Sequence, residues 1–130
     1  MTRPRPTQLN VLHVEDEPAN RALVRAILDR AGQERWARVD LREATTIAEA
    51  RSILASEPTD VVLLDVRLPD GNGLDLVDEI RTRAPQAKVV VVSASVLPAD
   101  RASALETGAD AFLAKPFGAA DLEQTLGRLT

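Results

Sequence analysis

The sequence VVLLD at residues 61–65, followed by the stretch LPDGNG at residues 68–73, decides the fold. Four consecutive aliphatic residues before Asp65 predict a short strand that is buried on both faces, as in a parallel sheet covered by helices. The Pro, Asp, Asn and Gly residues that follow are typical of a turn. Asp65 is therefore expected at the carboxyl end of a buried strand, next to a loop.

On both sides of this strand, segments of strand character alternate with segments of helical spacing. Strands are predicted at residues 9–14, 38–43, 61–64, 88–92 and 111–114. The first helix is expected to start at Pro18 and end at Gly32, and Thr46 with Glu49 forms a capping box for the second. Five strands alternating with five helices predict an α/β fold with a doubly wound, five-stranded parallel sheet.

Length and composition describe one domain. The chain has 130 residues, of which 45% are hydrophobic and 28% charged, and these values suit a single globular core. Residues 1–7 are rich in proline and are expected to form a flexible tail, which leaves residues 8–130 as the domain. The apolar runs are far too short to cross a bilayer and the N-terminus lacks the apolar core of a signal peptide, so a cytoplasmic location without membrane contact is expected.

Composition also excludes several kinds of site. The chain has no cysteine and a single histidine, His13, so it has no disulfide, no thiolate nucleophile and no multi-histidine metal centre. The net charge is −4 and no basic block follows the short start Arg3-Pro4-Arg5, which argues against direct nucleic-acid binding. His13 lies among apolar strand residues and is interpreted as a packed, hydrogen-bonded histidine, not as a phosphodonor.

Polar side chains follow four of the predicted strands. Glu15 and Asp16 follow the first strand, Asp65 ends the third, Ser93 follows the fourth and Lys115 follows the fifth. Ligand sites of such sheets lie at the carboxyl ends of the strands, so these groups are expected to share one rim. Clustered carboxylates need a cation to stay ionised together, and Mg²⁺ suits oxygen ligands. Asp65 then suits a nucleophile that accepts a phosphoryl group, with Ser93 donating a hydrogen bond and Lys115 supplying positive charge.

Four segments together resemble the receiver domains of bacterial response regulators. VLHVEDE at residues 11–17 is similar to the family's first strand and acidic pair, and VLLDVRLPDG at residues 62–71 is similar to its phosphoacceptor strand and loop. VVSA at residues 91–94 and FLAKPF at residues 112–117 are similar to its switch hydroxyl and Lys-Pro signatures. The resemblance covers residues 9–129 and implies the flavodoxin-like (βα)5 receiver fold of the CheY-like family.

The resemblance also implies what the acidic residues do. Asp65 would be the phosphoacceptor and a Mg²⁺ ligand. Asp16 and the backbone carbonyl of Arg67 would complete the protein's direct contacts to Mg²⁺, and Glu15 would act through water. A domain of this kind catalyses only its own phosphorylation and dephosphorylation and is not an enzyme for a separate substrate.

The remaining implied roles concern the switch and its partners. Ser93 and Lys115 would contact the phosphoryl oxygens, Ser93 and Phe112 would form the switch, and the Lys115–Pro116 peptide bond is expected to be cis. The phosphoryl donor would be a histidine kinase or a histidine phosphotransfer protein. The helix that starts at Pro98, the strand at residues 111–114 and the last helix would form the face that controls an unidentified protein target, and homodimers through this face are common in the family.

Other functions stay open beside this one. An aspartate-dependent phosphohydrolase needs a second acid two residues after the nucleophile, where this chain has Arg67. A nucleotide- or flavin-binding domain requires a Gly-rich turn after the first strand, where this chain reads VEDEP at residues 14–18. A receiver-fold interaction module that works without phosphorylation usually lacks an acid or the lysine, and this chain keeps them. Glu15 in place of the family's frequent aspartate and Phe112 in place of its frequent tyrosine are the main departures.

Overall fold

The computed structural model describes residues 8–35, 38–94 and 97–130 of the chain. The tail expected at residues 1–7 lies outside these ranges. Within the described part of the chain, no helix has both the length and the apolar character needed to span a membrane.

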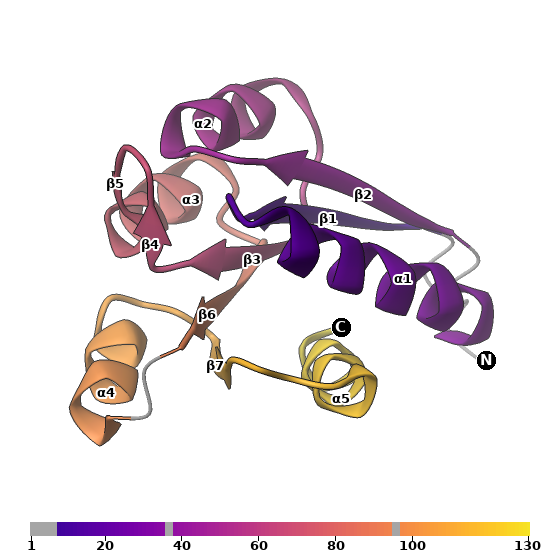
Figure 1. The fold of residues 1–130 in the computed structure, drawn as a ribbon. Helices are drawn as coiled ribbons and strands as arrows, with labels where there is room; N and C mark the ends of the chain where they lie inside the picture. Colours follow the sequence, from indigo (N-terminus) through magenta and orange to yellow (C-terminus); the bar gives the residue numbers. More distant parts are fainter. Residues whose placement is uncertain (1–7, 36–37, 95–96) are drawn as a thin grey trace, which may run out of the picture.

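Five parallel strands form the central sheet in the order β2-β1-β3-β6-β7. These strands are β1 (Leu9–Val14), β2 (Val39–Ala44), β3 (Val61–Asp65), β6 (Lys88–Ser93) and β7 (Ala111–Ala114). The helices are α1 (Pro18–Arg35), α2 (Ile47–Ser56), α3 (Val77–Arg83), α4 (Pro98–Glu106) and α5 (Ala119–Leu129). The predicted doubly wound α/β fold is confirmed (Figure 1).

Each face of the sheet carries its own apolar core. Val62 and Leu64 of β3 pack into a cluster with residues of α2, α3 and α4, whereas Val61 and Leu63 pack into a cluster with residues of α1 and α5. All four side chains are 0% exposed. Successive side chains of a strand point to opposite faces, so a central strand between two helical layers must be aliphatic at every position.

Two stretches of secondary structure differ clearly from the sequence-based expectation. Helix α1 continues through Gly32 to Arg35, because a glycine inside a helix costs only about 1 kcal/mol relative to alanine and does not by itself end a helix with a buried face. The stretch after Asp65 is also more ordered than a simple turn. It forms the antiparallel hairpin β4 (Arg67–Leu68) and β5 (Gly71–Asn72), followed by the 3₁₀ helix η1 (Gly73–Leu76).

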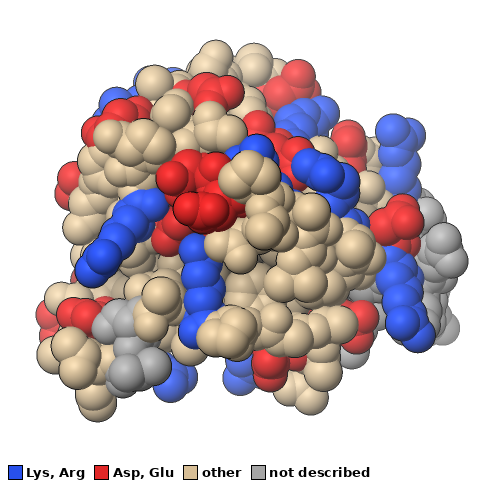
Figure 2. All heavy atoms as spheres, in the orientation of Figure 1, with Lys and Arg blue, Asp and Glu red and all other residues tan. Residues whose placement is uncertain are grey.

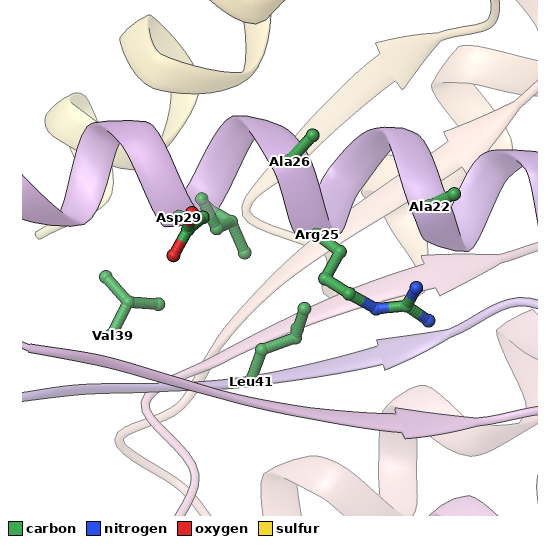
Figure 3. A pocket seen from close by; sticks show the side chains of 7 residues that line it. Ala22, Arg25, Ala26, Asp29, Val39 and Leu41 are labelled. Atoms are coloured by element: carbon green, nitrogen blue, oxygen red, sulfur yellow. The ribbon is translucent and has the colours of Figure 1, made fainter.

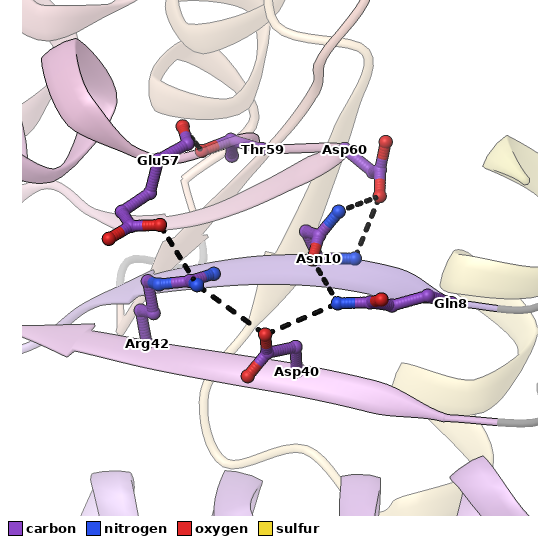
Figure 4. Close-up of polar contacts among 7 residues, drawn as sticks. All are labelled: Gln8, Asn10, Asp40, Arg42, Glu57, Thr59 and Asp60. Carbon is purple, nitrogen blue, oxygen red and sulfur yellow. Dashed lines mark hydrogen bonds and ion pairs between the residues drawn. The ribbon is translucent and has the colours of Figure 1, made fainter.

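A polar network closes the end of the sheet where the strands begin (Figure 4). The Asp60 carboxylate accepts hydrogen bonds from the backbone N–H of Asn10 at 2.7 Å and from its side chain at 3.1 Å. On β2, Asp40 accepts a hydrogen bond from Gln8 and lies 3.4 Å from Arg42. These contacts fix the start of β1 against β2 and β3. They lie at the opposite end of the strands from Glu15, Asp16 and Asp65.

His13 is buried at 2% exposure on β1, and within the described residues its Nδ1 has no hydrogen-bond partner. The prediction that His13 is packed is confirmed. The prediction that it is hydrogen-bonded is wrong for Nδ1. Burial lowers the pKa of His13 to about 4, against the opposing attraction of Glu15 and Glu43. The imidazole is therefore neutral at neutral pH.

Replacing His13 with leucine is expected to remove a pH-dependent loss of stability. The folded-state pKa of His13 lies below the unfolded value of 6.5, so the unfolded chain takes up a proton first as pH falls. The stability therefore decreases between about pH 6.5 and pH 4, by on the order of 3 kcal/mol. Urea unfolding across this window checks the difference between His13→Leu and wild type. Parallel pH profiles for the two proteins would contradict the assignment.

Candidate functional site

The three acidic side chains expected at the strand ends lie together. Glu15 and Asp16 follow β1, and Asp65 is the last residue of the neighbouring strand β3. One carboxylate oxygen of each lies within 4.8 Å of the others. Glu15 and Asp65 are only 1% and 8% exposed, and Asp16 is half-buried. Figure 2 shows acidic side chains gathered near the centre of the face viewed, with basic side chains directly beside them.

Lys115 joins two of these carboxylates. Its Nζ lies 2.7 Å from Glu15 Oε1 and 3.2 Å from Asp65 Oδ2. The backbone N–H of Lys115 donates to the carbonyl of Ser93 at 2.8 Å, which holds the lysine against the end of β6. The peptide bond from Lys115 to Pro116 is cis. The ends of β1, β3, β6 and β7 thus deliver their polar residues to one rim, as parallel strands do.

The close packing of like charges changes the ionisation of the pair Glu15 and Asp65. Burial, and then the neighbouring Glu15 carboxylate, raise the pKa of Asp65 to about 6, although Lys115 opposes this. Burial also acts to raise the pKa of Glu15, but hydrogen bonds from Lys115 and Asp65 and from the N–H of Glu17 outweigh it and lower that pKa. Burial acts to lower the pKa of Lys115, and the two carboxylates outweigh it and raise it. Glu15 and Asp65 thus share a single lysine, Lys115.

The donor set fits a hard divalent cation. Three carboxylates converge within a few ångströms, and Mg²⁺ is bound through one or two carboxylates while it keeps several waters. The backbone N–H of Arg67 lies 3.4 Å from Asp65 Oδ1, so the main chain of Arg67 is beside the same carboxylate. Ionised carboxylates at this spacing repel one another, and a bound cation would relieve that repulsion.

The loop after Asp65 is held tightly under the site. Gly73 donates its N–H to the Val66 carbonyl at 2.7 Å. A Cβ on Gly73 would lie far inside contact distance of the Asp65 carbonyl oxygen and 3.0 Å from its carbonyl carbon. The expectation that Gly73 serves only the geometry of a turn is therefore incomplete, because glycine here also permits the close approach of two backbone segments.

Two residues that brace the site are absent from the sequence-based prediction. The Asp70 carboxylate accepts hydrogen bonds from the N–H groups of Ile47 at 2.8 Å and Ala48 at 3.1 Å, so the hairpin β4–β5 caps helix α2. These bonds, the Ile47 bond first, lower the pKa of Asp70. Arg21 of α1 donates to the carbonyls of Glu15 and Asp16. Neither contact follows from a local pattern, since Thr46 and Glu49 already supply a cap for α2.

Two neighbouring cavities lie at this end of the sheet, and Asp16 and Asp65 line the first of them. The first, of about 590 Å³, is the cleft itself, and the second, of about 320 Å³, lies below α4. Ser93, Arg67 and Asp100 line both. Phe112 of β7 lines the second cavity together with Ser93, and it also lines a third hollow between α4 and α5. The two expected switch residues, Ser93 and Phe112, therefore border the same cavity.

A further cavity of about 420 Å³ lies away from the carboxylates, between α1 and β2 (Figure 3).

A doubly wound parallel sheet with three carboxylates and a lysine at the ends of its strands is the arrangement that the resemblance to receiver domains implies. Comparison with known proteins agrees. The family model of the response regulator receiver domain matches residues 11–127, and the chain belongs to this family, the receiver domains of two-component systems.

Among curated proteins, the chain is 44% identical over 105 residues to the response regulator protein PilR of Pseudomonas aeruginosa. The aligned residues make up 81% of this chain and 22% of that protein. It is 36% identical over 117 residues to the KDP operon transcriptional regulatory protein KdpE of Escherichia coli, covering 90% of this chain and 49% of that protein. The chain thus spans half or less of the length of these two relatives.

Solved structures give the same fold. The receiver domain of the sensor histidine kinase PA1611 from Pseudomonas aeruginosa, solved with a magnesium ion coordinated in its active-site cleft, superposes with a TM-score of 0.81 at 28% identity, over 94% of this chain and 97% of that one. A CheY-like receiver domain protein from Methanospirillum hungatei also gives 0.81, at 26% identity over 94% of both chains.

Proposed function

We propose that this receiver domain is a Mg²⁺-dependent signalling switch that accepts one phosphoryl group on Asp65. The convergence of Glu15, Asp16 and Asp65 within 4.8 Å, with Lys115 bonded to two of them, carries the proposal. The donor is a phosphohistidine of a histidine kinase or a phosphotransfer protein. The cleft, at about 590 Å³, has room for a donor group as well as the phosphoryl group.

In the proposed reaction an Asp65 carboxylate oxygen attacks phosphorus and the P–N bond to the donor imidazole breaks. The electron pair of that bond stays on the imidazole nitrogen, and Asp65 becomes an acyl phosphate. Lys115 then bonds to a phosphoryl oxygen, and Ser93 donates to another. Asp16, Asp65 and the Arg67 carbonyl, with Glu15 acting through water, would hold Mg²⁺, and the ion would supply positive charge for the transferred group. An aspartate-dependent phosphohydrolase needs a second acid two residues after the nucleophile. Arg67 occupies that position here, which argues against such an enzyme.

The output is proposed to pass from Ser93 through Phe112 to the face formed by α4, β7 and α5. Ser93 and Phe112 border one cavity, and helix α4 has Ala104 as its single buried residue, so few contacts oppose a shift of α4. Leu105 is 42% exposed on this face, where a hollow of about 250 Å³ lies between α4, β7 and α5. A protein target, or a second copy of the domain in a homodimer, would bind there, in the cytoplasm and without direct contact to nucleic acid.

The intact mass after incubation with acetyl phosphate tests the proposal. Wild type is expected to gain the mass of one phosphoryl group with Mg²⁺ and nothing with EDTA, and Asp65→Asn is expected to gain nothing. Asp60→Asn, which removes a carboxylate at the other end of β3, is expected to behave as wild type.

A phosphorylated Asp65→Asn would overturn the acceptor assignment. If wild type fails to react, beryllofluoride with Mg²⁺ replaces the donor, and the NMR signals of Ser93, Phe112 and Lys115 are compared before and after. Unchanged signals would favour the alternative of a receiver-fold interaction module that works without phosphorylation.

A further inference from the structure

Arg21 contacts the backbone of the acidic pair Glu15 and Asp16. Its guanidinium Nη1 donates to the Glu15 carbonyl at 3.0 Å and to the Asp16 carbonyl at 2.9 Å. Its own backbone N–H donates to the Glu17 carbonyl at 3.1 Å. A single half-buried side chain therefore holds two successive backbone carbonyls of the loop that carries both acids.

The sheet itself holds this loop only at its beginning. The N–H of Glu15 donates to the Ala44 carbonyl of β2 at 2.8 Å, and after this bond the chain leaves the sheet. Asp16 lies beyond it, yet its carboxylate meets those of Glu15 and Asp65. The bonds from Arg21 act on the backbone immediately around Asp16, where the ladder of the sheet has ended.

The position of Arg21 is unfavourable for the helix alone. It is the fourth residue of α1, and a cation near a helix N-terminus opposes the helix dipole. Two charge-assisted hydrogen bonds and the nearby carboxylates offset this cost. The side chain therefore serves the loop and the acidic site more than it serves the helix.

We infer that Arg21 is a positioning residue for the metal site: by holding the carbonyls of Glu15 and Asp16, it sets where the Asp16 carboxylate meets those of Glu15 and Asp65. The inference rests on the proposed function, because it assumes that these carboxylates bind Mg²⁺. Outer groups that orient metal ligands typically change metal affinity by about 10- to 100-fold when they are removed.

Arg25 provides a matched control on the same helix. It extends from α1 toward β2 (Figure 3) and forms two 2.8 Å contacts with Glu43, away from the acidic loop. Both arginines thus form charge-assisted hydrogen bonds from neighbouring turns of α1, but only Arg21 binds the backbone of the acidic pair. Arg25→Met removes a cation and an ion pair and leaves the loop contacts in place.

The test is a titration of the whole chain with Mg²⁺, followed by NMR, for wild type, Arg21→Met, Arg21→Lys and Arg25→Met. Arg21→Met is expected to raise the Mg²⁺ Kd by at least about 10-fold, and Arg25→Met is expected to leave it unchanged. Arg21→Lys keeps a cationic donor and is expected to restore most of the affinity. Without metal, amide hydrogen exchange at Asp16 and Glu17 is expected to speed up in Arg21→Met only, and urea unfolding reports stability separately.

A wild-type Mg²⁺ Kd for a folded Arg21→Met would overturn the inference, while phosphorylation of wild type would leave the proposed function standing. Equal losses in Arg21→Met and Arg25→Met would also overturn it, because they would point to a general effect on α1. If Arg21→Met does not fold, Arg21→Gln carries the same comparison. Failure of wild type itself to bind Mg²⁺ would overturn both the inference and the proposed function.

Discussion

Replacing Gly73 with alanine is expected to destabilise the protein by at least about 3 kcal/mol and to abolish phosphorylation of Asp65. The added Cβ would overlap the Asp65 carbonyl oxygen and lie 3.0 Å from the carbonyl carbon. Because the obstacle is backbone, it cannot turn away as a flexible side chain could, and an overpacked site of this kind ranks among the costliest substitutions. Relief would require β3 and η1 to separate, which displaces Asp65 from Glu15 and Asp16.

Urea unfolding followed by circular dichroism measures the loss of stability, and the acetyl phosphate reaction measures the loss of function. Gly118→Ala is the control, because a Cβ there would meet only Asp121 Oδ2 at 3.8 Å, an ordinary contact. It is expected to cost less than about 1 kcal/mol, the difference between glycine and alanine before a helix. A Gly73→Ala protein with wild-type stability and wild-type phosphorylation would show that the approach to Asp65 is looser than the structure indicates.

Asp65→Asn is expected to stabilise the metal-free protein at neutral pH by about 1–3 kcal/mol. The folded-state pKa of Asp65 is raised from 3.8 to about 6, first by burial and then by Glu15. Wild type therefore loses stability as pH rises from about 4 to about 6, and the whole loss is present above that window. Asparagine carries no charge, so its advantage appears above pH 6 and disappears below about pH 4.

Mg²⁺ should reduce or reverse this advantage. A ligand that binds only the folded state stabilises it, by about 2.7 kcal/mol at 100 times its Kd, and Asp65→Asn removes one of the proposed Mg²⁺-binding carboxylates. Thermal unfolding with and without Mg²⁺ at several pH values measures both effects. Asp60→Asn is the control: its parent carboxylate accepts hydrogen bonds from Asn10, so the variant should gain no stability and keep the full Mg²⁺ response. A destabilised Asp65→Asn at neutral pH would contradict the assigned cause of the raised pKa.

The centre of the sheet was predictable because β3 and β6 each contain four successive aliphatic residues, as buried strands do. Val62 and Leu64 serve one core and Val61 and Leu63 the other, and only a strand covered on both faces needs four aliphatic residues in succession. The end of α1 was not predictable from Gly32, since the cost of one glycine is small beside the packing of a whole helical face. Where a helix ends depends on the balance between the cost of single residues and the packing of the whole helix, and a local sequence pattern does not contain that balance.

The convergence of Glu15, Asp16, Asp65 and Lys115 followed from one rule, that parallel strands present their carboxyl ends on one side. The contacts that brace these residues did not follow. Asp70 reaches the N–H of Ile47, 23 residues earlier in the chain, only because the hairpin β4–β5 folds toward α2. The contact of Gly73 with the Asp65 backbone and the reach of Arg21 back to Asp16 likewise depend on the three-dimensional path of each loop.

The excess of acidic groups around Lys115 would make the proposed site bind its two ligands in a fixed order, Mg²⁺ before the phosphoryl donor. The carboxylates of Glu15, Asp16 and Asp65 lie within 4.8 Å of one another, and Lys115 bonds to Glu15 and Asp65, so acidic groups outnumber this lysine in the cleft. Under the proposed function, the incoming phosphoryl donor is itself an anion and would be repelled until a divalent cation had offset that excess. The proposed switch would then respond only when free Mg²⁺ and the phosphoryl donor are both present.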